Sequence, residues 1–128
     1  MYHLTALVTL LAILFFFFTS MNVSRSRTRT GVKAPAMSGH PDFERAFRIQ
    51  MNTLEWMPIF LPSLWLFAVY IGDAAAGGIG AVWIIGRIVY FIGYSKAAAK
   101  RGPGFFIQGI AAIVLWAGAL GAVVLRLV

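Results

Sequence analysis

Four long apolar stretches alternate with short polar segments along the chain. They cover residues 4–23, 43–71, 79–100 and 105–127, and each approaches the roughly 20 residues that a helix needs to cross the hydrocarbon core of a bilayer. Segments rich in Gly, Pro, Ser, Thr or charge separate them at 24–41, 72–78 and 102–104. The pattern predicts an all-α integral membrane protein, a four-transmembrane-helix bundle in which residues 1–128 form a single membrane domain.

Composition supports a membrane protein over a soluble one. Of the 128 residues, 60% are hydrophobic and 12% are charged, whereas soluble domains average roughly 45–50% apolar and about 25% charged residues. This balance excludes a soluble enzyme and a free nucleic-acid binder, although the net charge of +7 alone would suggest nucleic acid. The chain has no cysteine, so any thiol chemistry must use a thiol that a ligand brings. His3 and His40 have no partner at metal-ligand spacing, and we expect no metal site.

The basic residues gather beside two of the three connections. They are Arg25, Arg27, Arg29, Lys33, Arg45 and Arg48 at the first connection, and Lys96, Lys100 and Arg101 at the third. In a four-span protein these connections lie on one side of the membrane, and the second connection carries only Asp73. The positive-inside rule predicts both termini outside and both basic connections in the cytoplasm. We expect a bacterial inner membrane as the location.

Polar residues inside the second apolar stretch form one stripe. At about 100° per residue, Arg48, Asn52 and Glu55 lie within about 60° of one another on a helix. Gln50 points nearly the opposite way, so it does not easily serve the same pocket from the same subunit. Polar groups inside spans are costly and by default face a bundle interior or an aqueous cavity. The stripe therefore indicates one wall of a polar crevice.

The third apolar stretch carries a second polar stripe. Arg87, Tyr90, Tyr94 and Arg101 follow the spacing i, i+3, i+7 and i+14, which again keeps them on one helical face. Two facing stripes form a crevice that opens toward the cytoplasmic end and suits a small zwitterion with several carboxylates. Arginines fork onto carboxylates, Glu55 can take an ammonium, and Asn52 and the tyrosines complete the hydrogen bonds.

Other interpretations of the same residues stay open at this point. Interfacial anchoring explains single basic residues and tyrosines near the ends of spans. Glu55 could instead form a structural ion pair with Arg48 or with Arg87. The same crevice would also serve a non-catalytic small-molecule-binding or transport membrane protein, or a catalytically silent one. The first stretch has no carboxylate, which counts against a four-span exporter.

Two motifs resemble the signature of a known family. They read Glu44-Arg45-x-x-Arg48-x-Gln50-x-Asn52-x-x-Glu55 with Pro58-x-Phe60-Leu61 after it, and Arg87-x-x-Tyr90-x-x-Gly93-Tyr94 with Arg101 at the end of the same span. Together they resemble the MAPEG family, the membrane-associated proteins of eicosanoid and glutathione metabolism, and the likeness is greatest to its microsomal glutathione transferases. It covers essentially the whole chain.

The resemblance implies an assembly and a set of ligand contacts. The family is homotrimeric and holds glutathione between neighbouring subunits. On this pattern the glutathione-holding residues are Arg48, Asn52, Glu55, Tyr90 and Tyr94, with Arg87 in support, Gln50 and Arg27 from the adjacent subunit, and Arg101 beside the sulfur as the catalytic residue. The implied co-substrate is glutathione, and the implied partners are a second and third copy of the chain, membrane lipids and a hydrophobic electrophile.

The expected function is that of a membrane-bound glutathione transferase. It would conjugate the glutathione thiolate to hydrophobic electrophiles from the bilayer, a detoxification reaction, with glutathione-dependent peroxidase activity as a companion. Trp56, Thr28 and Gly102 differ from the residues that eicosanoid-synthesising members carry there. These differences favour a general transferase. The alternative remains a non-catalytic binding or transport protein.

Overall fold

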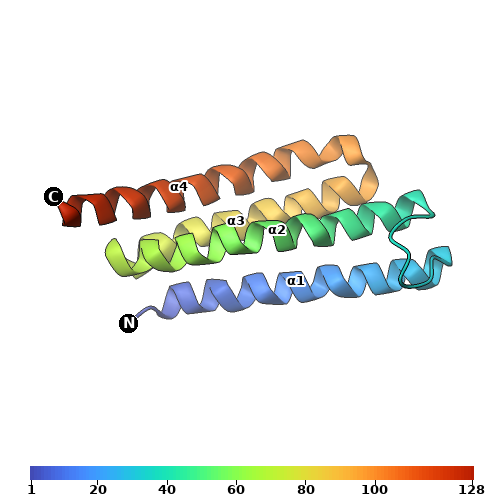
Figure 1. Cartoon of the computed structure of the whole chain (residues 1–128), viewed down its shortest axis with the longest axis horizontal. Helices are drawn as coiled ribbons and strands as arrows, with labels where there is room; N and C mark the ends of the chain where they lie inside the picture. Colours follow the sequence, from blue (N-terminus) through green and yellow to red (C-terminus); the bar gives the residue numbers. More distant parts are fainter.

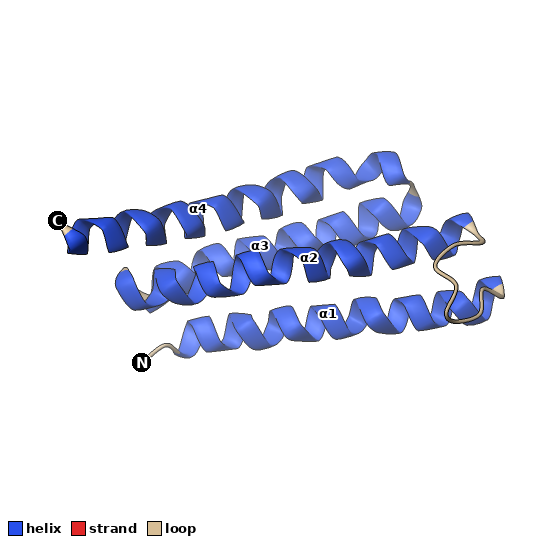
Figure 2. Ribbon diagram, in the orientation of Figure 1, coloured by secondary structure: helices blue, strands red, loops and turns tan.

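The computed structural model describes all residues 1–128 as four long helices that run alternately up and down (Figure 1). They are α1 (His3–Thr30), α2 (Pro41–Tyr70), α3 (Asp73–Lys96) and α4 (Gly102–Leu127), with a short 3-10 turn, η1 (Ala98–Arg101), before α4. Helices and loops account for the whole chain (Figure 2). All four helical segments are long and apolar enough to cross a membrane, so the predicted four-helix membrane fold is confirmed.

The two ends of the bundle differ in chemistry. The α1–α2 connection and η1 lie at one end, while both termini and the α2–α3 connection lie at the other (Figure 1). The two basic connections therefore share an end, as their charges predict, and we call it the basic end. Large apolar side chains cover the outer surface between the two ends; Leu14 and Phe17, for example, are 63% and 64% exposed. Such a surface is suited to lipid rather than water.

Helix α1 extends beyond the predicted span. The apolar stretch ends at Val23, but the helix continues to Thr30, so that only residues 31–40 form the connection. Gly31 ends the helix with φ 77°, a left-handed conformation that favours glycine, and its N–H donates to Arg27 O at 2.9 Å. Arg27 and Arg29 in the last turn stabilise the negative end of the helix dipole. The polar composition of this segment ends the span without ending the helix.

The third span is shifted rather than lengthened: it was predicted to cover residues 79–100, but α3 begins at Asp73. It was predicted to run to Lys100, whereas α3 ends at Lys96 and residues Ala98–Arg101 form η1. This turn connects α3 to α4, which begins with Gly102 and Pro103. Arg101 therefore lies on a turn between two helices and not on the helix that carries the tyrosines.

Helices α2 and α3 form the centre of the bundle, with α1 and α4 on either side. Phe60 of α2 stacks on Trp83 of α3 with ring centroids 3.9 Å apart, and both rings are fully buried. Asp73 at the start of α3 fastens the start of α1, because its carboxylate accepts hydrogen bonds from the backbone N–H groups of Leu4 (3.1 Å) and Thr5 (2.8 Å) and from the Thr5 hydroxyl. The ring stacking thus joins α2 to α3, and the Asp73 carboxylate joins α3 to α1.

Candidate functional site

The polar stripes of α2 and α3 meet at a cavity of about 490 Å³ at the basic end. Its walls come from α2, α3, η1 and α4, and its lining residues are Arg48, Asn52, Tyr90, Tyr94, Arg101 and Phe105. The structure thus brings five residues of the predicted set around one space. Phe105 was not predicted, because it belongs to α4 and no polar motif marks it.

The spacing of the lining residues explains why they face the same space. Arg48 and Asn52 are four residues apart on α2, as are Tyr90 and Tyr94 on α3, so each pair occupies one helical face. The two tyrosine rings pack edge to face with centroids 5.4 Å apart. Phe105 of α4 closes the space from the other side, 6.2 Å from the Tyr90 ring. The cavity therefore offers guanidinium, amide and phenol groups beside an aromatic wall.

Arg87 does not line this cavity but forms a hydrogen bond with Asn52, which does. Its side chain is fully buried, and it donates to Asn52 Oδ1 (2.8 Å) and to Thr53 Oγ1 (2.6 Å). Its guanidinium also lies 4.3 Å from the centre of the Tyr90 ring. Because a guanidinium can only donate hydrogen bonds, the oxygen of Asn52 must face Arg87. The amide NH₂ of Asn52 is then left for a ligand, so Arg87 is a positioning residue in the single chain.

Glu55 does not line the cavity but forms an ion pair with Arg48, which does. Its Oε1 is 3.5 Å from Arg48 Nη2, and the two side chains are 60% and 48% exposed. Of the two ion pairs that the sequence allowed, the structure forms the one with Arg48 and not the one with Arg87. Exposed pairs contribute little to stability, so this pair is more useful as a set of charges available to a ligand.

Arg101 projects from η1 beside Tyr94. Its Nη1 donates to Ala98 O at 2.7 Å, and its guanidinium carbon is 5.7 Å from the centre of the Tyr94 ring. The side chain is exposed, and its remaining N–H groups have no partner in the chain. A cation on a turn at the mouth of the cavity can contact a ligand that enters from the basic end.

Two predicted site residues lie elsewhere in the single chain. Gln50 donates to Ser20 Oγ of α1 at 2.7 Å. Arg27 donates to Ala36 O at 2.8 Å and lies over the ring of Phe43 at 4.6 Å. Both residues belong to the side of the chain formed by α1 and α2, away from the cavity lining. Within one chain they do not join the other site residues.

An apolar groove adjoins the polar cavity. Phe105 lines the cavity and packs edge to face against Trp56, with ring centroids 5.7 Å apart. Trp56 in turn lines a hollow of about 230 Å³ between α2 and α4, together with Ile59, Ala112, Ile113 and Trp116. The sequence alone does not single out these tryptophans, since tryptophan is common at membrane interfaces. The polar cavity and the apolar groove are therefore adjacent, and the Trp56–Phe105 pair separates them.

Fold and site together define an integral membrane protein with a cationic, amide-lined and phenol-lined cavity at one end. Comparison with known proteins identifies the family. The model of the MAPEG family matches residues 5–121, and the chain belongs to this family. The resemblance drawn from the two motifs is thereby confirmed.

Several curated proteins are similar over most of the chain. An uncharacterized protein of Synechocystis, sll1147, is 45% identical over 122 residues, which are 95% of this chain and 89% of that protein. Human microsomal glutathione S-transferase 2 is 44% identical over 103 residues, 80% of this chain and 70% of the human protein. Leukotriene C4 synthase of Cavia porcellus is 41% identical over 98 residues, 77% of this chain and 65% of that enzyme.

Proposed function

We propose that this protein is a membrane-bound glutathione transferase whose glutathione site is the cavity between α2, α3 and α4. The observation that carries the proposal is the convergence of Arg48, Asn52, Tyr90, Tyr94 and Arg101 on one 490 Å³ space. The space has the size of ordinary small-molecule sites, about 300–1,000 Å³. Family membership and the similarity to a glutathione S-transferase support the same ligand.

The chemistry of the lining matches glutathione, a tripeptide with two carboxylates and one ammonium group. Arg48 can form a bidentate pair with a carboxylate of glutathione, and Glu55 beside it can bind the ammonium group. The free amide of Asn52 can donate a hydrogen bond to a peptide or carboxylate oxygen. Tyr90 and Tyr94 supply phenol hydroxyls. Arg87 acts through Asn52, which it orients. Each polar part of glutathione thus has a partner of opposite character.

Arg101 is assigned to the glutathione sulfur as the catalytic residue. A free thiol has a pKa of about 8.5, and lowering it by about two units takes ~2.7 kcal/mol. One cation at about 4 Å supplies ~4 kcal/mol at an effective dielectric constant of 20, before desolvation. Because a guanidinium does not release its proton in proteins, Arg101 stabilises the thiolate and does not act as a base. The thiol proton leaves to solvent.

The second substrate is a hydrophobic electrophile that enters from the bilayer. The apolar groove at Trp56 and Trp116 can hold it beside the polar cavity. The thiolate then forms a carbon–sulfur bond, and the electrophile either loses its leaving group with the bonding electrons or takes up a proton after addition. As a companion reaction, two glutathione molecules reduce one lipid hydroperoxide to an alcohol and water and form glutathione disulfide. Both reactions suit detoxification.

The proposed assembly is a homotrimer with the site between subunits. It gives a role to Gln50 and Arg27, which lie outside the cavity of their own chain and would reach the glutathione of a neighbour. The proposed orientation places both termini outside and the site on the cytoplasmic side of a bacterial inner membrane, in line with the charge of the basic end. Thiol labelling of a Lys33→Cys variant in intact cells checks this orientation, since the chain has no other cysteine.

Thiolate formation tests the proposal. Glutathione is mixed with the detergent-solubilised protein, and the thiolate absorbance is followed by stopped flow. We expect the wild type to show a thiolate signal at neutral pH and Arg101→Ala to lose most of it. The matched control is Lys100→Ala, which removes an exposed cation from the same turn and should keep the signal.

Calorimetry separates the remaining possibilities. Glutathione that binds without thiolate formation would identify a non-catalytic binding or transport protein. If the wild type shows neither binding nor a thiolate signal, the proposed function is wrong.

A further inference from the structure

A second polar cavity lies on the other side of the α2–α3 pair. It measures about 330 Å³ and is lined by Asn22, Ser26 and Arg29 of α1, Asp42, Arg45 and Ala46 of α2, and Phe91 and Ser95 of α3. None of these residues lines the cavity proposed for glutathione. On α3, Phe91 and Ser95 each follow one of the two site tyrosines by one residue, which turns them by about 100° around the helix. The second cavity is a separate space at the same basic end.

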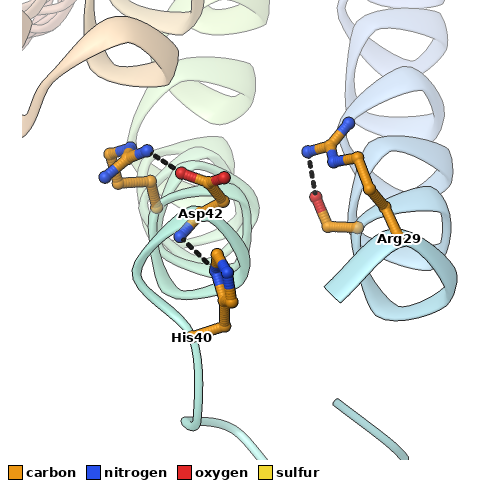
Figure 3. Close-up of polar contacts among 5 residues, drawn as sticks. Arg29, His40 and Asp42 are labelled. Carbon is orange, nitrogen blue, oxygen red and sulfur yellow. Dashed lines mark hydrogen bonds and ion pairs between the residues drawn. The ribbon is translucent and has the colours of Figure 1, made fainter. Parts of the chain in front are cut away.

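This cavity carries one positive charge that nothing in the chain compensates. Its lining holds two arginines and one carboxylate, and the carboxylate of Asp42 is bonded to Arg45 three residues along the same helix. Figure 3 shows Asp42 at the start of α2 and Arg29 on the facing side of α1, with no bond between them. The only hydrogen bond of the Arg29 side chain is a long one, 3.3 Å, to Ser26 Oγ in its own helix. Arg29 is therefore free to take an anion.

Several hydrogen-bond donors in the lining also lack partners. The Asn22 amide and the Ser95 hydroxyl both line the cavity, and neither forms a hydrogen bond within the chain. An oxyanion with several acceptor oxygens would satisfy these donors together with Arg29. A cationic ligand would instead be repelled by the two arginines.

An aromatic track leads from the cavity toward the middle of the bundle. Phe91 lines the cavity and packs against Phe18 and Phe15 of α1, with ring centroids 5.2 and 6.3 Å away. Phe15, Phe18 and Asn22 are three and four residues apart, so they follow one face of α1. Phe18 is 48% exposed in the single chain, so an acyl chain can lie against its ring. The oxyanion site and a surface for an acyl chain are thus continuous.

We propose that this cavity binds the phosphate group of an anionic phospholipid, with one acyl chain lying along Phe18 and Phe91. The phosphate accepts hydrogen bonds from Arg29, Asn22 and Ser95. A headgroup without an ammonium group is favoured, because an ammonium would be placed beside the uncompensated charge of Arg29. The inference does not depend on glutathione binding, since the two cavities share no residue.

Lipid retention in nanodiscs tests the proposal. The full chain is reconstituted in phosphatidylcholine with a minor share of phosphatidylglycerol, released, and analysed by native mass spectrometry for retained lipid. We expect the wild type to retain phosphatidylglycerol and Arg29→Gln to retain about tenfold less, since a hydrogen-bonded charge contact of about 1.4 kcal/mol corresponds to that factor. Arg25→Gln is the matched control, because Arg25 is an exposed cation of the same helix outside the cavity. It should retain as much as the wild type.

A second pair of variants tests whether an acyl chain lies along the aromatic track. Phe18→Ala should retain less phosphatidylglycerol, whereas Phe17→Ala should not, because Phe17 is exposed but does not pack against Phe91. Asn22→Leu fills the cavity without removing a charge and should lower retention as well, which covers the case that Arg29→Gln does not fold.

Two results would overturn the proposal. The first is an equal loss of phosphatidylglycerol with Arg25→Gln and Arg29→Gln, which would mean only general attraction at the interface. The second uses inorganic phosphate added to protein in pure phosphatidylcholine. A rise in the melting temperature that needs Arg29 but not Phe18 would assign the cavity to a soluble oxyanion instead of a lipid.

Discussion

Arg87 is a charged side chain buried in the centre of a membrane helix bundle, and its hydrogen bonds explain how it is held there. One bond goes to Asn52, which faces the proposed glutathione site, and one goes to Thr53, which is fully buried. Burying a charge is costly unless it is hydrogen-bonded. The bond to Thr53 therefore stabilises both the fold and the position of the Asn52 amide.

Thr53→Val should destabilise the protein and weaken glutathione binding. Valine keeps the shape of threonine but leaves one N–H of Arg87 without a partner, which costs about 1–3 kcal/mol. Thermal unfolding in detergent and calorimetry with glutathione measure the two effects. Thr28→Val is the control, because Thr28 is exposed at the end of α1, and it should leave both unchanged. Wild-type stability of Thr53→Val would contradict the supporting role of Arg87.

The residues of the site divide into those that the sequence can predict and those that it cannot. Arg48 with Asn52, and Tyr90 with Tyr94, are spaced by one helical turn, so periodicity alone places each pair on one face. Phe105 comes from another helix and carries no polar signal, so its place depends on how α3 packs against α4. Spacing also put Arg87 on the stripe of the tyrosines but could not distinguish a ligand contact from a buried support.

At the scale of elements, close packing of α3 against α4 sets the geometry of the cavity. Gly104 of α4 lies directly against the backbone of α3: a Cβ there would overlap Tyr90 N and come within 2.7 Å of Gly86 O. Gly86 faces α4 in the same way, since its Cβ would lie 2.6 Å from Gln108 N. Small residues allow such close approach between membrane helices. The contact holds Tyr90 and Phe105 at their observed separation.

Gly104→Ala should force α3 and α4 apart and widen the cavity. Overpacking of this kind typically costs about 1–3 kcal/mol, and glutathione affinity should fall because Tyr90 and Phe105 move apart. Gly109→Ala is the matched control, since a Cβ at Gly109 meets nothing within 4 Å and alanine favours the helix by up to about 1 kcal/mol. Melting temperatures and glutathione titrations of the two variants measure the stability and the affinity. If Gly104→Ala matched Gly109→Ala in both, the close contact between α3 and α4 would be contradicted.

The boundaries of the elements show where hydropathy is a poor guide. It marks where an apolar span ends, and it placed the end of the first span at Val23. The helix itself ends where the backbone requires it, at the left-handed Gly31. Hydroxyl side chains such as Thr30, which bonds back to Ser26 O at 2.6 Å, are polar yet compatible with a helix. The seven extra residues supply Ser26 and Arg29, which line the second cavity.

At the scale of the whole molecule, charge and topology agree. Four spans and two basic connections predict that both basic connections share one side, and the bundle places them at one end with the termini at the other (Figure 1). Both polar cavities open at that end. The packing of neighbouring chains, by contrast, depends on surfaces that periodicity does not describe, since apolar outer faces serve lipid and protein contacts alike.

Gln50 offers a way to test the proposed trimer. In the single chain it bonds to Ser20 and contributes nothing to the cavity. If the site lies between subunits, the double variant Arg27→Ala, Gln50→Leu should lower glutathione affinity by about tenfold or more, because contacts to a charged ligand are worth about 1.5–3 kcal/mol. Ser20→Ala removes the same internal hydrogen bond but keeps the Gln50 amide, so it should bind nearly as well as the wild type.

Mixing two defective variants, Arg101→Ala and the double variant, then tests where the residues act. In a cyclic trimer each site joins one subunit to the next, so a site is intact when the subunit that supplies Arg27 and Gln50 carries Arg101→Ala and its neighbour carries the double variant. Random assembly from equal amounts makes about a quarter of the sites intact in this way. Conjugation activity at a limiting glutathione concentration should therefore recover in the mixture and not in either variant alone. If all these residues served a site within one chain, every site would keep one defect and no activity would return.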